Sequence, residues 1–365
     1  MNTPAEALAS LTPPPHRLAL VALPDLTRPI DAVSALAALE RWLPPRSARI
    51  AVVGLGLHRP LSAAELAPLR AVWSGQVLNH DPDRCVRVGT VQGHPLEVNP
   101  LVLEADLRIS VGVVELHQYA GFSGGHKGVV VGLGGRATLD ALHHRDVVLH
   151  PEVIVGQLHP NPFRAAIDAM GERLGVALAL LFNGARWFAG PPSPTLRQAA
   201  AGLRSWYQVS ARAREVILRV PTTKAVNLYQ ASRAATYLAL SPAPPLEDGA
   251  TLFLDAACPE GMGQGSGERA FAEAMAAHAG NLDALLVGEA PRGAGTQRAL
   301  MLARLARRYR LVITGCDTAA TLRPYGLDAT SVPAASLAGP RAITVPDAFH
   351  LLPQLAGATV EPSLS

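Results

Sequence analysis

Residues 18–57 read LALVALPDLTRPIDAVSALAALERWLPPRSARIAVVGLGL, and their order of apolar and polar positions predicts the fold class. Leu18–Leu23 and Ile50–Leu57 are apolar runs of strand length, whereas Ile30–Leu43 has apolar residues at helical spacing. A strand, a helix and a second strand in this order are typical of a βαβ unit with parallel strands. We therefore expect an α/β fold with a mainly parallel sheet.

The same alternation continues toward residue 214. Ser62, with Glu65 three residues on, predicts a capped helix from Ala63. Further strands are expected at Val98–Leu103, Leu107–Val114 and Val176–Phe182, helices at Thr138–His144, Pro162–Arg173 and Leu196–Ala213, and a proline-rich loop at Ala189–Pro194.

A second α/β unit is expected beyond residue 214, because 365 residues exceed what one hydrophobic core usually holds. We predict two α/β domains with mainly parallel sheets, residues 1–214 and 215–365, and an active-site cleft between them. In the second domain the pattern predicts strands at Val216–Val220, Thr251–Ala256, Ala284–Val287, Leu311–Thr314 and Ala342–Val345, and helices at Ala225–Leu238, Gly267–Ala279, Gly295–Arg307 and Asp347–Leu352.

The composition favours a cytoplasmic protein that acts on a small molecule. The net charge is only +3 and the arginines are scattered, so no nucleic-acid surface is indicated. The three cysteines, Cys85, Cys258 and Cys316, are odd in number and form no CxxC pair, which suits a reducing cytosol. We expect no export signal and no membrane span, since the apolar runs are too short.

Lysine is nearly absent: 30 of the 32 basic residues are arginines, and only Lys127 and Lys224 remain. Arginine cannot deprotonate to act as a nucleophile, so a lysine that survives such a bias is a candidate reactive amine. Chance survival is the alternative for either residue. Lys224 is interpreted as an incidental surface residue, and the alternative is that it adds charge near the substrate.

Polar residues follow three of the predicted strands of the first domain. Asp25, His58 and His117 each stand where an apolar run ends, and catalytic groups in open α/β sheets gather at these carboxyl ends. Two plainer interpretations stay open. Asp25 or Thr27 could only cap the following helix, and His58 could be a structural histidine.

A glycine-rich loop, Gly121-Phe-Ser-Gly-Gly-His-Lys127, follows His117. It is not a nucleotide-binding P-loop, because His126 separates the last glycine from the lysine and Gly128 stands where Ser or Thr would bind magnesium. The glycines would instead let a flat ligand approach the backbone beside one amine. His143 and His144 lie on different faces of a predicted helix, so only one of them can face a site.

These residues carry a resemblance to a known family. The segment His117–Lys127 resembles the signature of the nickel-pincer lactate racemases and their homologues. Four further motifs occur in the same order as in that family: Asp25-Leu-Thr-Arg28, Gly56-Leu-His58, Asn227-Leu-Tyr-Gln230 and Cys258-Pro-Glu-Gly261. Together the matching motifs span most of the chain.

The resemblance implies a nickel-bearing cofactor, pyridinium-3,5-bisthiocarboxylic acid mononucleotide, tethered as a thioamide to Lys127. It implies nickel binding by His143, cofactor contacts from Asp25, Leu26, Thr27 and Arg28, general-base roles for His58 and His117, and substrate contacts from Tyr229, Gln230 and Arg233. One imidazole would take the hydroxyl proton of a 2-hydroxy acid while its α-hydride passes to the cofactor and returns to the opposite face. Cofactor-biosynthesis proteins would load the enzyme.

Two departures bear on the substrate. Arg233 stands where the family has lysine, and Val220-Pro-Thr-Thr-Lys-Ala225 replaces a pattern that contains an aspartate. We therefore expect a racemase or epimerase that acts on a 2-hydroxy acid. The sequence does not identify which 2-hydroxy acid is the substrate. The alternative is a protein of the same fold that binds or handles the cofactor without turning over a hydroxy acid.

Overall fold

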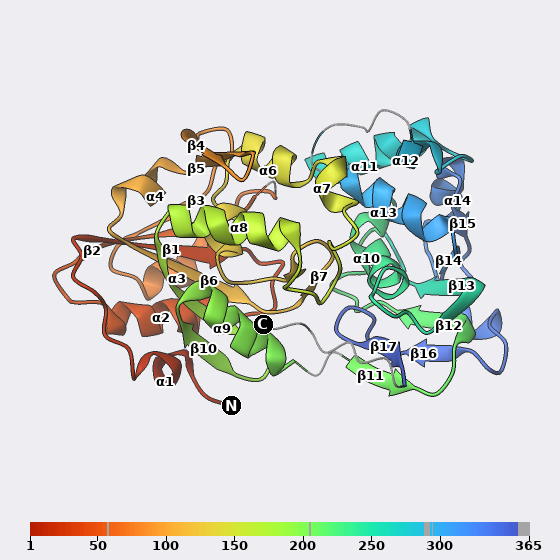
Figure 1. The fold of residues 1–365 in the computed structure, drawn as a ribbon, viewed down its shortest axis with the longest axis horizontal. Coiled ribbons are helices and arrows are strands. Elements are labelled where there is room, and N and C mark those ends of the chain that lie inside the picture. Colours follow the sequence, from red (N-terminus) through yellow and green to blue (C-terminus); the bar gives the residue numbers. More distant parts are fainter. Residues whose placement is uncertain (57, 204–205, 288–292, 294, 357–365) are drawn as a thin grey trace.

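The computed structural model describes residues 1–56, 58–203, 206–287, 293 and 295–356, and Figure 1 shows two α/β halves side by side. The N-terminal half, red to green in the figure, holds one large sheet, and the C-terminal half holds a second. The predicted fold class, two α/β units with largely parallel sheets, is confirmed. No helix in the described part of the chain is long and apolar enough to cross a membrane.

The sheet of the N-terminal half has the strand order β10-β9-β6-β1-β2-β3 within the described residues. β1 pairs in parallel with β2 on one side and with β6 on the other, whereas β10 runs antiparallel to β9. The strands are β1 (Leu18–Pro24), β2 (Ala48–Gly54), β3 (Gln76–Asn79), β6 (Leu107–Val113), β9 (Val176–Phe182) and β10 (Trp187–Gly190).

Both faces of this sheet are covered by helices. Val21 of β1 belongs to the core that contains α2 and α3, whereas its neighbour Leu20 belongs to the core that contains α5 and α8. This half contains α1 (Pro4–Leu8), α2 (Ala32–Trp42), α3 (Ala63–Ala71), α4 (Pro100–Glu104), α5 (Lys127–Val130), α6 (Arg136–Leu142), α7 (Arg145–Val148), α8 (Pro162–Arg173) and α9 (Pro192–Ala201), with the hairpins β4 (Val86–Val91)–β5 (His94–Val98) and β7 (Leu116–His117)–β8 (Gly121–Phe122).

The second sheet has the order β15-β14-β13-β12-β16, and its pairs are parallel. Its strands are β12 (Ala213–Arg219), β13 (Leu246–Asp255), β14 (Arg310–Thr314), β15 (Asp328–Ala329) and β16 (Ile343–Val345). The surrounding elements are α10 (Leu228–Ala239), α11 (Ser266–Ala277), α12 (Ala284–Val287), α13 (Gln297–Ala306), α14 (Ala319–Leu322) and the 3₁₀ turns η1 (Arg323–Tyr325) and η2 (Ala334–Ser336).

The predicted helix start at Ser62 is confirmed in detail. The Ser62 hydroxyl accepts a hydrogen bond from the Glu65 N–H at 3.3 Å, and the Glu65 carboxylate accepts one from the Ser62 N–H at 2.7 Å. The strand predicted at Ile50–Leu57 is shorter, since β2 ends at Gly54, and Leu57 lies outside the described residues.

The strand predicted at Val98–Leu103 is wrong. β5 ends at Val98, and α4 begins at Pro100 after Asn99, whose side chain accepts a hydrogen bond from the Leu101 N–H at 3.1 Å. Asn followed by Pro is a helix-start signal, and it determines the structure here more than the apolar run does.

The loop predicted at Ala189–Pro194 and the long helix predicted at Leu196–Ala213 are also wrong. β10 ends at Gly190, and α9 begins at Pro192, because proline is tolerated in the first turn of a helix. α9 ends at Ala201, and part of the predicted helix, residues 204–205, lies outside the described residues. The short strand β11 (Trp206–Val209) then pairs with β17 (Leu352–Leu355), a partner too distant in sequence to predict locally.

Two elements of the second half also differ. Ala284–Val287, predicted as a strand, is the helix α12, since four apolar residues are too few to show a period. Asp347–Leu352, predicted as a helix, forms a turn, in which the Asp347 carboxylate accepts a hydrogen bond from the Phe349 N–H at 3.1 Å, and Leu352 begins β17.

The domain division at residue 214 remains our proposal. Strands of the first sheet end at Gly190, and those of the second begin at Ala213. β11 precedes the proposed boundary but pairs with β17, so the segment around 206–209 lies with the C-terminal half (Figure 1).

Candidate active site

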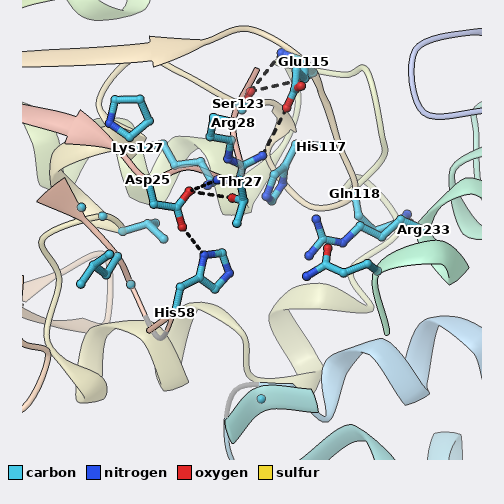
Figure 2. Close-up of a pocket in the computed structure, with 18 of the residues that line it drawn as sticks. Asp25, Thr27, Arg28, His58, Glu115, His117, Gln118, Ser123, Lys127 and Arg233 are labelled. Carbon is cyan, nitrogen blue, oxygen red and sulfur yellow. Dashed lines mark hydrogen bonds and ion pairs between the residues drawn. The ribbon is translucent and has the colours of Figure 1, made fainter. Parts of the chain in front are cut away.

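Three adjacent strands of the first sheet bring polar residues to one edge. β6, β1 and β2 are neighbours, and their carboxyl ends lead into His117, Asp25 and His58 respectively. A cavity of about 860 Å³ opens there, within the range of roughly 300–1,000 Å³ usual for ligand pockets. Residues of both halves line it, among them the N-terminal part of α10. Figure 2 shows the polar groups that converge on it.

The structure brings ten of the eleven predicted site residues to this cavity. The ten are Asp25, Thr27, Arg28, His58, His117, Lys127, His143, Tyr229, Gln230 and Arg233. The exception is Leu26, whose side chain is 63% exposed and does not line the cavity. The structure therefore does not place Leu26 with the other predicted site residues.

Asp25 is held by two neighbours. Its Oδ2 lies 2.5 Å from Nδ1 of His58, and its Oδ1 accepts hydrogen bonds from the Thr27 hydroxyl at 2.6 Å and the Thr27 N–H at 3.1 Å (Figure 2). Burial acts to raise the pKa of Asp25, but the bonds and charge of His58, together with Thr27, outweigh it and lower that pKa to about 2. The cap of α2 is Asp31, so neither Asp25 nor Thr27 caps this helix.

The carboxylate of Asp25 sets the proton position on His58. An ionised carboxylate beside Nδ1 favours the tautomer that carries its proton on Nδ1, which leaves a lone pair on Nε2. The His58 side chain is 41% exposed, so this nitrogen can reach a ligand. His58 therefore has the arrangement of a general base.

His117 has the opposite arrangement. Its Nδ1 accepts hydrogen bonds from the backbone N–H groups of Ala120 at 3.1 Å and Tyr119 at 3.3 Å. Burial, reinforced by the charges of Lys127 and Arg28, lowers the pKa of His117 well below its usual value, so the ring is neutral near pH 7. A neutral ring that accepts at Nδ1 carries its proton on Nε2, and it presents a hydrogen-bond donor.

Lys127 begins α5, directly after the glycine loop, and lines the cavity. Burial, together with the charges of Arg28 and Arg164, lowers the pKa of Lys127 to about 7. The backbone approaches closely here, because a Cβ on Gly128 would lie 2.3 Å from the Ser110 hydroxyl. A substantial fraction of the amine is therefore unprotonated at neutral pH, and this form can act as a nucleophile.

This pKa gives a testable pH dependence. The rate at which a limiting acetylating reagent modifies Lys127 should rise through pH 7 and level off above it, since only the neutral amine reacts. Peptide mass spectrometry across pH 5–10 would follow it. A rate that keeps rising toward pH 10.5, the usual lysine value, would contradict the assignment.

Arg164 of α8 holds the glycine loop in place. Its buried guanidinium donates to the backbone carbonyls of Ala120, Phe122 and Gly124, and lies 3.5 Å from the Asp168 carboxylate. These carbonyls belong to the segment between His117 and Lys127. Arg164 thus fixes the spacing of the two groups from outside the cavity.

Replacing Arg164 by leucine should lower the free energy of unfolding by about 3–5 kcal/mol, because it removes one partner of a buried ion pair and its bonds to loop carbonyls. Urea denaturation followed by circular dichroism measures this change. The exposed Arg17, whose pair with Asp106 is a surface ion pair, provides the control, and Arg17→Leu should cost under about 1 kcal/mol. Equal effects of the two variants would refute the role of Arg164.

His143 is the C-cap residue that follows α6, and it lines the cavity. Its Nδ1–H donates to the Leu139 carbonyl at 2.8 Å, which leaves the Nε2 lone pair available to a metal ion. Burial lowers the pKa of His143 to about 4, so the ring is neutral, as a ligand must be. His144 is 60% exposed beside Asp146, and the geometry favours His143. The described residues include no cluster of three or more His, Cys, Asp or Glu able to hold a metal.

Glu115 and His350 are among the cavity residues that the sequence analysis did not identify, and Lys224, which it left open, also lines the cavity. Glu115 lies 3.3 Å from Arg28 and 3.7 Å from His350, and Lys224 donates to the Thr27 carbonyl at 2.9 Å. Burial opposes ionisation of Glu115, but His350 and Arg28 hold the pKa of Glu115 at about 2. Its place at the end of an apolar strand was an available signal. No local sequence pattern indicated His350, because it reaches the cavity only through the packing of the C-terminal segment.

The second half contributes α10. Asn227 caps this helix by accepting a hydrogen bond from the Gln230 N–H at 3.0 Å, which places the first turns of α10 at the cavity. Tyr229 packs edge-on against Phe271, and the Arg233 guanidinium lies over the Tyr229 ring at 5.8 Å. Tyr229, Gln230 and Arg233 thus face the strand ends of the first half.

Fold and site together define a protein of two α/β halves whose shared cavity is lined by a lysine and several histidines. Residues 2–156 match the family described as the lactate racemase N-terminal domain. The chain is 31% identical over 168 residues to the lactate racemase of Lactiplantibacillus plantarum and 29% identical over 166 residues to that of Thermoanaerobacterium thermosaccharolyticum. The N-terminal part of the chain is thus similar to the N-terminal domain of lactate racemases.

The sequence matches cover 43% of this chain and 39% of each relative. The fold likeness extends further. The lactate racemase apoprotein from T. thermosaccharolyticum matches with a TM-score of 0.80 at 20% identity, over 96% of this chain and 92% of that one. A protein from Thermotoga maritima matches with a TM-score of 0.72 at 15% identity, over 96% of both chains. At such identities the structures show a shared fold.

Proposed function

We propose that this protein is a racemase or epimerase that inverts the α-carbon of a small 2-hydroxy acid with a nickel-pincer nucleotide attached to Lys127. The observation that carries this proposal is the Lys127 amine, with a pKa of about 7, in one cavity with His58 and His117. Among the described residues no carboxylate forms an ion pair with this amine, as expected for a group that reacts rather than pairs.

The residues present fit such a cofactor. Lys127 would form the covalent link, and His143, neutral with its Nε2 available, would bind nickel. Arg28 and Lys224 supply charge and donors for a phosphate at one end of the cavity. When bound, the cofactor would supply the hydride acceptor.

The chain's own groups would handle the substrate oxygen. His58 would accept the hydroxyl proton at Nε2, because Asp25 holds its Nδ1–H. His117 would donate its Nε2–H to the substrate, and it could serve as a second base only after losing the two backbone donors at Nδ1. Tyr229, Gln230 and Arg233 would bind the carboxylate.

We also propose that the protein works in the cytoplasm and receives its cofactor from the proteins that make it. The three cysteines are unpaired, which suits a reducing compartment. A 2-hydroxy acid is the only ligand class that the proposed reaction requires besides the cofactor.

The test is to produce the protein together with the cofactor-making enzymes and to incubate it with single enantiomers of a panel of 2-hydroxy acids. Chiral chromatography should show inversion of at least one acid. Inversion of none, with the cofactor attached, would favour the alternative of a cofactor-binding protein without turnover. Protein that gains neither added mass nor nickel would overturn the proposal.

A further inference from the structure

A pair of arginines lies in the cavity wall contributed by the second half. Arg233 is on α10, and Arg298 is at the start of α13, a helix that packs against α10. Both line the cavity, and Figure 2 shows the Arg233 guanidinium pointing into it, on the side away from Lys127. Arg298 is 4% exposed. The pair thus brings two fixed positive charges into one enclosed wall.

Neither guanidinium is neutralised by the protein. Among the residues that the structure describes, neither has a carboxylate at ion-pair distance, and Nε of each is buried without a hydrogen-bond partner. Arg298 donates a hydrogen bond to the Thr236 hydroxyl at 3.2 Å, and this acceptor is uncharged. The charge of Arg298 adds to burial in lowering the pKa of Arg233, as expected for like charges close together.

The acidic residues of the cavity do not compensate this charge. Four of them line it, and each is engaged elsewhere within the described residues. The pairs are Asp25 with His58, Glu115 with Arg28, and both Glu260 and Glu268 with Asn227. Because an uncompensated buried charge is destabilising, we expect a ligand to supply the missing anions.

Two neutral groups next to the pair also lack partners. The Tyr119 hydroxyl and the Gln118 side-chain oxygen are buried without a hydrogen bond in the described structure, and both residues line the cavity. A phenol hydroxyl can donate a hydrogen bond, and an amide oxygen can accept one. A polar ligand is therefore expected here, not an apolar side chain.

We infer that this wall binds a 2-hydroxy acid with a second carboxylate, so that Arg233 and Arg298 together bind a dianion. A single carboxylate can neutralise one guanidinium, whereas a 2-hydroxydicarboxylate neutralises both. The binding of a dianion at this wall is inferred from the arginine pair alone. Its role as the substrate rests, in addition, on the proposed function. A lysine at 233 would lack the bidentate fork that suits carboxylates.

The test compares malate with 2-hydroxybutanoate, which has the same four carbons and the same hydroxyl but a methyl group in place of the second carboxylate. Isothermal titration of the full chain should show malate binding roughly 10- to 100-fold more tightly, the effect of a charged hydrogen bond. In Arg298→Met this preference should fall to under about threefold. Arg304→Met, on the same helix but outside the cavity lining, is the matched control and should retain it.

Equal binding of the two acids by a folded wild-type chain would overturn the inference. A preference for malate that is retained in Arg298→Met would also overturn it. Inorganic phosphate that binds at least as tightly as malate, and binds more weakly to Arg298→Met, would show instead that the pair is a phosphate site. If Arg298→Met fails to fold, Arg298→Gln, which also removes the charge but keeps a polar side chain, provides the same comparison. Malate bound selectively but never inverted by the loaded protein would contradict the proposed function and leave the dianion site standing.

Discussion

Replacing Lys127 by arginine should abolish both cofactor attachment and racemisation. Arginine keeps the positive charge and much of the length, but a guanidinium does not deprotonate and cannot form the covalent link. Intact-protein mass spectrometry of chains produced with the cofactor-making enzymes should show added mass on the wild type and none on the variant. The racemisation rate should fall below detection.

The chain supplies a matched control, because Lys224 is its one other lysine and also lines the cavity. Lys224→Arg should keep the added mass, and peptide mapping should assign that mass to the peptide that contains residue 127. Added mass on Lys127→Arg, or its loss in Lys224→Arg alone, would show that the attachment site is misassigned.

The second large effect is expected at His58 and its partner. His58→Gln should lower the racemisation rate about 10²- to 10⁴-fold with the cofactor mass unchanged, because the proton acceptor is lost. Asp25→Asn should lower the rate by a similar order, since an amide N–H facing Nδ1 would shift the ring proton to Nε2 and occupy the accepting position.

The exposed His144 provides the control for these variants, and His144→Gln should keep the wild-type rate. A His58→Gln enzyme that retains its rate would refute the role of His58 as base. If Asp25→Asn is fully active while His58→Gln is not, the carboxylate does not set the tautomer.

Much of the fold could be predicted because its central strands are local apolar runs. Leu107–Val113 and Val176–Phe182 are strands in the structure as the pattern indicated. The errors fall where a short signal competes with a pattern, as at Asn99-Pro100, or where the partner is distant, as for β11 and β17. Local periodicity contains no information on such partners.

The site was predictable where residues follow strands of one sheet, as Asp25 and His58 do. Orientation was not predictable: the sequence gives no sign that His58 faces a carboxylate whereas His117 accepts two backbone N–H groups. The residues missed, such as His350 and Arg298, reach the cavity through the packing of the two halves. Lys224, which could have been an incidental surface residue, lines the cavity and bonds to the Thr27 carbonyl.

The most direct test of the account is the fate of the α-hydrogen during inversion. A 2-hydroxy acid that the loaded enzyme inverts should be supplied with deuterium at the α-carbon in ordinary water, and the product analysed by chiral separation and mass spectrometry. A hydride that leaves the α-carbon and returns to its other face does not exchange with water, so the inverted acid should keep its deuterium. Inverted acid with hydrogen from solvent in its place would show proton abstraction from carbon and contradict the account.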